Sequence, residues 1–103
     1  MVGQYFESEQ RTRMSSLWFV YILECKNKSL YTGITNDLER RVNEHRSGQG
    51  ARYTRAFGVA KLVYQEARAN RSVASKREAE IKSLTRKQKL EFIQKKKNDV
   101  SKR

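Results

Sequence analysis

The chain of 103 residues contains no proline and a single cysteine, Cys25. One cysteine cannot form an internal disulfide, and no Cys-x-x-Cys pair or Cys/His cluster is available to bind zinc. We expect Cys25 to be half-exposed at a strand end, and the lack of disulfides favours an intracellular, cytoplasmic location. No Pro-rich linker, internal repeat or low-complexity segment divides the chain, so its length suits one domain with a modest core.

Long hydrophobic runs are also missing. The longest, residues 17–23, is too short to cross a bilayer, and without a basic leader or a small-residue cleavage site we expect no signal peptide. Acidic residues are few: 11 stand against 23 Lys and Arg, which gives a net charge of +12 and a pI near 10.2. This excess of positive charge predicts a polyanionic partner. Nucleic acid is a better candidate than an anionic membrane, because no predicted helix combines a basic face with a large apolar face.

The pattern of apolar residues predicts an α+β domain with a small three-stranded sheet, antiparallel or mixed, flanked by about three helices in the order ββαβαα. The predicted strands are residues 17–24, 30–34 and 61–67, and the predicted helices are residues 37–46, 72–84 and a third from residue 85. Residues 49–58 are interpreted as a basic loop. We expect residues 1–16 to be a flexible N-terminal extension, residues 17–94 the domain, and residues 95–103 a flexible basic tail.

The strand at residues 17–24 is apolar on both faces, which predicts a central strand covered on both sides. One face would carry Phe19, Tyr21 and Leu23, and the other Trp18, Val20 and Ile22. The polar loop that follows leads back into residues 30–34, so the two strands form a hairpin.

The stretch from residue 30 to residue 45 is a strand that runs through a turn into a helix. Gly33 has no side chain, so another group can approach the backbone closely there. Asn36 and Glu39 have the spacing of a capping box. The inward face of the helix would carry Arg41 and His45 besides apolar Leu38 and Val42. Burying an arginine side chain costs on the order of several kcal/mol unless it pairs with an anion, so we expect Arg41 to have an anionic partner.

The second predicted helix repeats this feature, because Glu78 lies on the same stripe as Ala74 and Ile81. Tyr21 and Tyr31 lie on the hairpin strands, where facing residues are about 5 Å apart. The third helix would begin at a capping box, Thr85 with Gln88, and turn Leu90 and Ile93 inward.

Two interpretations of these inward-facing groups compete. In the structural one, Arg41 and Glu78 form a buried salt bridge, His45 donates to a backbone carbonyl, and the tyrosines belong to the core. In the functional one, the groups surround a phosphodiester: Glu78 binds a divalent metal, Arg41 binds a phosphate oxygen, and a tyrosine or His45 handles the proton. A tyrosine, with an unperturbed pKa of about 10, needs help to act as a base, whereas histidine titrates near neutrality. Residue chemistry alone does not choose between them.

The sequence resembles the GIY-YIG nuclease superfamily. The resemblance is carried by Phe19-Val20-Tyr21 and Tyr31-Thr32-Gly33, ten residues apart, and by residues 36–45, 47–55 and 75–82. It covers about residues 18–93 and points to the small single-domain bacterial members and the related N-terminal domain of the excision-repair nuclease. Phe19, Val20 and Thr32 replace the usual signature residues, and the C-terminal asparagine of some relatives has no clear counterpart, which bears on the efficiency of the site.

This resemblance implies a three-stranded antiparallel sheet flanked by helices, and metal-dependent hydrolysis, with Mg²⁺ or Mn²⁺, that leaves 3′-hydroxyl and 5′-phosphate ends. By the same resemblance the catalytic residues would be Tyr21, Tyr31, Arg41, His45 and Glu78. Glu78 would hold the metal, and Gly33 would let the substrate or the helix close in.

A basic surface accompanies the predicted site. Its candidate nucleic-acid contacts are Arg40, Arg46, Arg52, Tyr53 and Arg55. The alternative is that Tyr53 packs locally and the arginines are only solvated. A second group of basic residues forms either another basic patch or, together with Lys102 and Arg103, a solvated tail: Arg86, Lys87, Lys89, Lys95, Lys96 and Lys97.

The sequence thus predicts a monomeric endonuclease that acts on DNA rather than RNA, in repair or recombination, with no membrane partner and with a protein partner for specificity. The alternative function is a non-catalytic nucleic-acid-binding module with the same fold.

Overall fold

The computed structural model describes residues 17–101, and the side chains of residues 17–97. The predicted α+β fold is confirmed: the described part of the chain forms a three-stranded antiparallel sheet with four helices. Residues 1–16, predicted as a flexible extension, lie outside the described residues. In chain order the elements are β1 (Trp18–Cys25), β2 (Leu30–Thr35), α2 (Leu38–Arg46), α3 (Arg52–Phe57), β3 (Val59–Arg68), α4 (Arg71–Lys82) and α5 (Arg86–Ser101).

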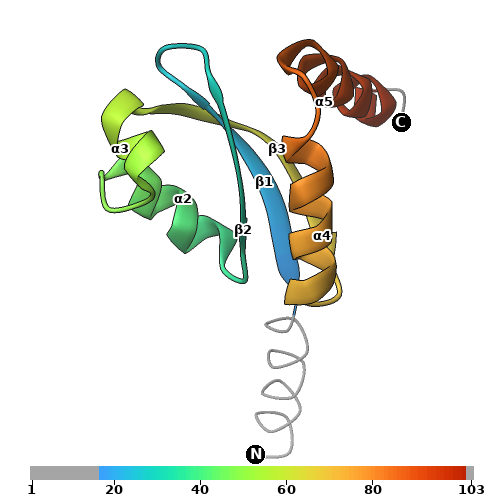
Figure 1. Cartoon of the computed structure of the whole chain (residues 1–103), viewed down its shortest axis with the longest axis horizontal. Helices are drawn as coiled ribbons and strands as arrows, with labels where there is room; N and C mark the ends of the chain where they lie inside the picture. Colours follow the sequence, from blue (N-terminus) through green and yellow to red (C-terminus); the bar gives the residue numbers. More distant parts are fainter. Residues whose placement is uncertain (1–16, 102–103) are drawn as a thin grey trace, which may run out of the picture.

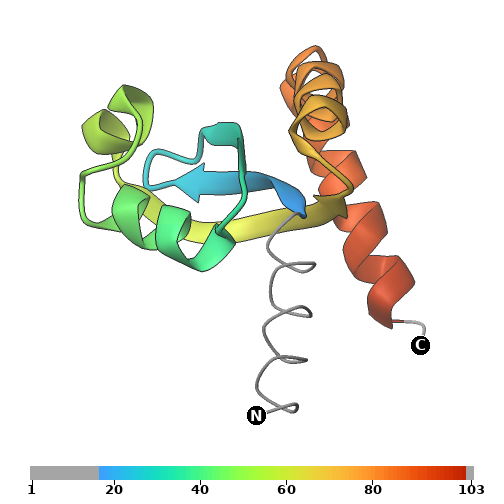
Figure 2. The ribbon, with the colours of Figure 1, turned by 90° about the horizontal axis from the view of Figure 1, so that it is seen from below.

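β1 is the central strand, between β2 and β3, and it runs antiparallel to both. Tyr21 stands opposite Gly33 of β2 on one side and Gln65 of β3 on the other. Figures 1 and 2 show α2 and α3 on one side of the sheet and α4 and α5 on the other. Successive side chains of β1 therefore meet different helices, and the prediction of a strand covered on both faces is confirmed.

The two faces of the sheet bury two separate clusters. The cluster under α4 and α5 consists of Val20, Ile22, Tyr64, Ala74, Ile81 and Ile93. The cluster under α2 consists of Tyr21, Leu23 and Val42, with Tyr31, Leu38, Val59 and Leu62 packed against it. The first cluster carries most of the aliphatic burial, whereas the second places two phenols next to the helix that bears Arg41 and His45.

The helix caps agree with the sequence at one position and differ at another. The predicted capping box at Thr85 is confirmed: its N–H donates to Gln88 Oε1 at 2.9 Å, and the Gln88 N–H donates to Thr85 Oγ1 at 3.1 Å. The predicted cap at Asn36 is wrong by one residue. Asp37 caps α2 instead, because its carboxylate accepts a main-chain N–H three residues further on, so the expected pairing with Glu39 does not apply.

A helix, α3, stands within residues 49–58, where the sequence predicted only a loop, so the order is ββααβαα. α3 is six residues long, and its N-cap residue, Ala51, gives no side-chain hydrogen bond. Gly58, with a φ of 71°, ends it. Thr54 is the buried residue of α3, and its contact with α2, described below, holds the short helix in place.

Three further details differ from the sequence predictions. Cys25 is fully buried rather than half-exposed, because β1 extends to this residue and pairs it with Val59 of β3. Ile93 is buried as predicted, but Leu90 is 41 % exposed, because α5 turns Phe92 and Ile93 toward the sheet. α5 also includes residues 95–101 of the segment predicted as a flexible tail.

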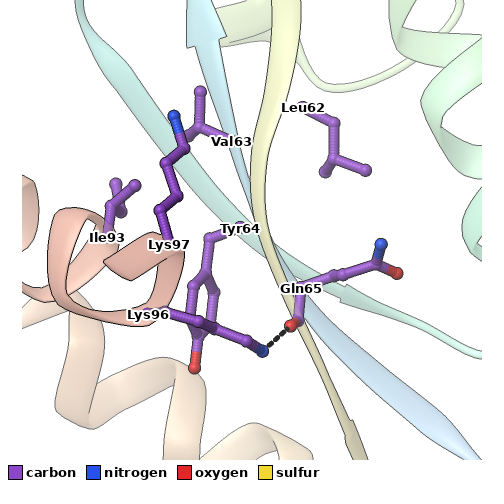
Figure 3. Close-up of a pocket in the computed structure, with 7 residues that line it drawn as sticks. All are labelled: Leu62, Val63, Tyr64, Gln65, Ile93, Lys96 and Lys97. Atoms are coloured by element: carbon purple, nitrogen blue, oxygen red, sulfur yellow. Dashed lines mark hydrogen bonds between the residues drawn. The ribbon is translucent and has the colours of Figure 1, made fainter. Parts of the chain in front are cut away.

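A groove of about 500 Å³ lies between β3 and α5, away from the predicted site residues. Figure 3 shows its lining, with Lys96 crossing the ring of Tyr64. The Lys96 ammonium lies 4.5 Å from the ring centroid and donates to the carbonyl of Gln65, so this lysine fastens α5 to β3. Among the described residues, none of the helices has the length and apolar character that a membrane crossing requires.

Candidate active site

Tyr21 lies across Gly33. The two residues are opposite each other in the β1–β2 register, and a Cβ atom added to residue 33 would lie 2.5 Å from Oη and 2.7 Å from Cζ of Tyr21. The phenol therefore occupies the space that any other residue at position 33 would fill. The sequence predicted a close approach at this glycine, and Tyr21 itself makes that approach in the structure.

A buried chain of hydrogen bonds joins Tyr21 to the segment after α2. The hydroxyl oxygen of Tyr21 lies 2.8 Å from Nε2 of His45, and Nδ1 of His45 lies 2.7 Å from Oγ1 of Thr54. The Thr54 hydroxyl in turn donates to the carbonyl of Ala51 at 3.0 Å. The structural interpretation expected His45 to bond a backbone carbonyl directly, but the hydroxyl of Thr54 stands between them.

Sequence reasoning missed Thr54 and Gly50 as parts of this arrangement. Thr54 is as buried as His45, at 1 % exposure. A Cβ added to Gly50 would lie 2.3 Å from Nδ1 of His45, so the imidazole packs directly on this backbone. The available signal was the succession of Gly48, Gly50 and a short polar residue after the helix, which the sequence analysis assigned to a basic loop.

Arg41 and Glu78 do not form the interhelix salt bridge of the structural interpretation. Arg41 pairs with Glu44 of its own helix at 3.2 Å, and Glu78 pairs with Lys82 of its own helix at 3.1 Å. The Arg41 side chain is 33 % exposed and that of Glu78 is 21 % exposed. The inward-facing arginine thus has an anionic partner nearby, yet both groups keep surface that a ligand can contact.

Tyr21 is the residue on which these groups converge. Burial raises the pKa of Tyr21 to about 12, and Tyr31 and the charge of Glu78 act in the same direction, while Arg41 opposes them. Burial also lowers the pKa of His45 to about 4, and Arg41 adds to the lowering. At neutral pH both members of the pair are therefore uncharged, and the lone pair of a neutral imidazole is available to a proton.

Aromatic contacts lead from this pair to the surface. The ring centroid of Tyr31 lies 5.2 Å from that of His45 and 6.1 Å from that of Tyr53, which stacks on it at 25°. Tyr53 in turn lies 4.9 Å from Phe57. Tyr53 and Phe57 are 39 % and 44 % exposed, so Tyr53 both packs locally and presents a face to solvent.

The helices on this side of the sheet also carry exposed arginines. The four predicted arginine contacts are all exposed, two on α2 and two on α3: Arg40, Arg46, Arg52 and Arg55. Figure 1 shows these two helices next to each other, so the exposed aromatics and the arginines belong to one end of the molecule. Such a mixture of cations and aromatic rings is typical of surfaces that bind nucleic-acid strands.

The donor atoms at this site suit a hard divalent cation that needs few protein ligands. Within the described residues, no group of three or more His, Cys, Asp or Glu side chains is placed to hold a metal ion. Glu78, the metal ligand that the resemblance implies, would supply one carboxylate, with the rest of the shell from water and phosphate oxygens. Mg²⁺ accepts this arrangement because it keeps several waters and commonly uses one or two carboxylates.

Comparison with known proteins assigns the class. Residues 17–91 match the GIY-YIG catalytic domain. The chain belongs to the GIY-YIG family, whose members are nucleases that generally depend on a divalent metal, so the family indicates a nucleic-acid substrate.

Its relatives are UPF0213 proteins. The chain is 56 % identical over 75 residues to one from Clostridium perfringens, with 73 % of this chain and 81 % of the relative covered. It is 49 % identical over 81 residues to one from Haloquadratum walsbyi, with 79 % and 91 % covered.

Two solution NMR structures are also similar. The UPF0213 protein BH0048 from Bacillus halodurans is 44 % identical, with a TM-score of 0.50 and with 76 % of this chain and 83 % of that chain covered. The protein EF2693 from E. faecalis is 41 % identical, with a TM-score of 0.54 and with 77 % and 84 % covered.

Proposed function

We propose that this protein is a metal-dependent endonuclease that hydrolyses phosphodiester bonds in DNA, in repair or recombination. The observation that carries the proposal is that the phenol of Tyr21 interacts with an imidazole and a guanidinium from one helix and lies within reach of the charge of a carboxylate from another. Phosphoryl transfer depends mainly on positioning and charge neutralisation, and these are the groups that supply them.

Arg41 is the proposed phosphate ligand. Its planar fork matches two phosphate oxygens, and a third of its side chain is accessible beside Tyr21. Glu44, which now pairs with it, holds the guanidinium in place until the phosphate arrives. Glu78 is the proposed metal ligand, and a bound Mg²⁺ or Mn²⁺ would neutralise charge on the scissile phosphate and on the leaving oxygen.

Tyr21 and His45 are the proposed proton acceptors and act as a pair. The attacking water gives a proton to Oη of Tyr21 while the Tyr21 hydroxyl proton passes to Nε2 of His45, so Tyr21 need not ionise on its own. Tyr31 contacts both rings, at centroid distances of 6.4 Å and 5.2 Å, and we propose that it orients the water or the phosphate.

The surface formed by α2 and α3 is the proposed path of the DNA strand. Its arginines would follow the phosphates, and Tyr53 would stack on a base. We further propose a cytoplasmic monomer, with a protein partner that adds specificity because so small a domain has little surface left for sequence readout.

Cleavage of defined DNA tests this function. The full chain is incubated with plain, nicked and branched DNA, with and without Mg²⁺. We expect Mg²⁺-dependent cleavage that Glu78→Gln and Arg41→Ala each reduce by at least about a hundredfold. Glu80→Ala is the matched control, since Glu80 is an exposed carboxylate on the same helix. Equal cleavage by all four proteins would show that a contaminant cuts the DNA.

The second candidate is a nucleic-acid-binding module without catalysis, and the exposed arginines and aromatics of α2 and α3 favour it equally. It predicts binding without cleavage under every condition. The salt dependence of nucleic-acid binding would then become weaker when Arg52 or Arg55 is replaced by alanine, because each phosphate contact contributes about one unit to the salt slope.

A further inference from the structure

Thr54 and His45 share a buried hydrogen bond for which the sequence analysis had no role. We propose that Thr54 is a positioning residue: it holds His45 in the tautomer with the proton on Nδ1, so that the lone pair of Nε2 faces Tyr21. The catalytic consequence rests on the proposed function, whereas the tautomer itself does not.

The direction of the bond follows from counting donors. A threonine hydroxyl has one proton to donate, and the Thr54 hydroxyl donates it to the carbonyl of Ala51 at 3.0 Å. The 2.7 Å contact with His45 must then be a bond that Nδ1–H donates to Thr54 Oγ1. A neutral imidazole has a single N–H, so Nε2 is the acceptor in its 2.8 Å contact with the Tyr21 hydroxyl.

The opposite tautomer leaves a buried proton without a partner. If Nε2 carried the hydrogen, it would donate to Tyr21, and the Tyr21 hydroxyl would need another acceptor. Arg41, which also interacts with that hydroxyl, has only donors. Within the described residues no other side chain or carbonyl accepts from it. The cost of a buried hydroxyl without a partner favours the Nδ1–H form by more than a factor of about five.

Gly50 closes the other side of the ring. The Cβ position of residue 50 lies 2.3 Å from Nδ1 and 2.9 Å from Cα of His45, so the glycine backbone packs against the imidazole. A ring held between this backbone and Tyr31 cannot turn over to exchange its two nitrogens. Both Gly50 and Thr54 come from the segment that follows α2, and that segment therefore sets the chemistry of a residue on the helix.

The consequence for the proposed reaction is specific. With the proton on Nδ1, Nε2 can take the proton of Tyr21, and the imidazolium that forms keeps its Nδ1–H bond to Thr54. With the proton on Nε2, the ring presents a donor to Tyr21 and cannot accept from it. Loss of Thr54 should therefore lower kcat and leave KM nearly unchanged.

The test uses the fact that the chain has one histidine. The ¹⁵N spectrum of the imidazole of the full chain, at pH 7.5 and without metal, reports which nitrogen carries the proton. We expect Nδ1–H in the wild type and in Thr54→Ser, and a shift toward Nε2–H in Thr54→Val. Thr32→Val is the matched control, because Thr32 is also buried but lies on β2, and its hydroxyl has no hydrogen-bond partner among the residues that the structure describes.

A wild-type spectrum with the proton on Nε2, or an unchanged tautomer in Thr54→Val, overturns the assignment. With DNA and Mg²⁺, we expect Thr54→Val to lower kcat about tenfold to a hundredfold, with recovery in Thr54→Ser. A changed tautomer with unchanged kcat overturns the positioning role in catalysis. If no variant cleaves nucleic acid, the proposed function fails, while the spectra still decide the tautomer.

Discussion

The hydroxyl oxygen of Tyr21 lies 2.8 Å from Nε2 of His45, and each residue is 1 % exposed. One ring comes from the central strand and the other from α2, so the contact joins the sheet to the helix that covers it. Because both side chains are almost fully buried, the pKa of the phenol is raised and that of the imidazole is lowered. Residues that keep the two rings in place therefore control both the stability and the chemistry of the site.

Gly33→Ala should displace Tyr21. The new Cβ would lie 2.5 Å from Oη, so the ring must leave Gly33 and its bond to His45. We expect a loss of about 1–3 kcal/mol in the free energy of unfolding, as for other overpacked cores, together with the loss of cleavage. Urea unfolding and a cleavage assay with Mg²⁺ measure the two effects.

Gly48→Ala separates these effects. Gly48 has a φ of 84°, and its Cβ would meet nothing within 4 Å, so alanine costs about 1–2 kcal/mol of backbone strain without touching either ring. We expect this variant to be destabilised but to cleave normally. Normal cleavage by Gly33→Ala as well would contradict the position of Tyr21 in the proposed reaction.

Acid should destabilise the fold through His45. In the unfolded chain the imidazole binds its proton near pH 6.5, but in the folded protein its pKa is lowered to about 4. Between these values the unfolded chain binds more protons, so the stability contributed by the neutral ring is present above pH 6.5 and is lost as the pH falls toward 4. The loss should reach about 3 kcal/mol, since one pKa unit corresponds to about 1.4 kcal/mol.

Urea unfolding of the wild type and of His45→Gln at pH 7.5, 5.5 and 4.5 isolates this contribution. Carboxylates titrate in both proteins, so the difference between their two stability curves reports the imidazole. A difference that does not change between pH 7.5 and 4.5 would show that the folded protein accepts the proton on His45 as readily as the unfolded chain.

Thr32→Val should stabilise the protein. Thr32 is 4 % exposed, and its hydroxyl has no hydrogen-bond partner in the described part of the chain. Replacing this hydroxyl with a methyl group removes a burial cost of about 1 kcal/mol or more and keeps the shape of the side chain. The same substitution at Thr54 should destabilise, because it removes two bonds. Thermal unfolding of both variants should give shifts of opposite sign.

Much of the fold could be predicted because its signals are periodic. Alternation along residues 17–24 placed Tyr21 and Val20 on opposite faces, and a period of 3.6 placed Arg41 and His45 on the inner face of α2. The third helix was predicted to begin at Thr85 from the spacing of its two capping residues, and the reciprocal bonds confirm it.

The remaining features depend on contacts that no local pattern contains. α3 is too short for a periodic signal and has no side-chain cap, so its conformation depends on tertiary contacts, such as the bond between His45 and Thr54, more than on propensity. A helical period also predicts the face on which a residue lies but not its partner. Arg41 pairs with Glu44 on its own helix, whereas the sequence analysis considered only Glu78 or a phosphate as the partner.

The exposed face of Tyr53 leads to a prediction about the form of DNA that binds. An aromatic ring can stack only on a base that is free of its own stack, so Tyr53→Ala should weaken the binding of single-stranded DNA by about 1–3 kcal/mol, or about fivefold to 150-fold. Fully paired duplex should be affected less. Fluorescence anisotropy with labelled strands at several salt concentrations measures both affinities.

Arg55→Ala should behave differently in the same titrations. Arg55 is exposed on α3, two residues after Tyr53, and a phosphate contact there releases a counterion whatever the base. Its loss should weaken both DNA forms and reduce the salt slope by about one unit, whereas Tyr53→Ala should leave that slope unchanged. Equal losses for single strands and duplex in Tyr53→Ala would contradict stacking on a base and leave the ring with its packing on Tyr31 and Phe57. This pair of variants therefore separates base contact from charge.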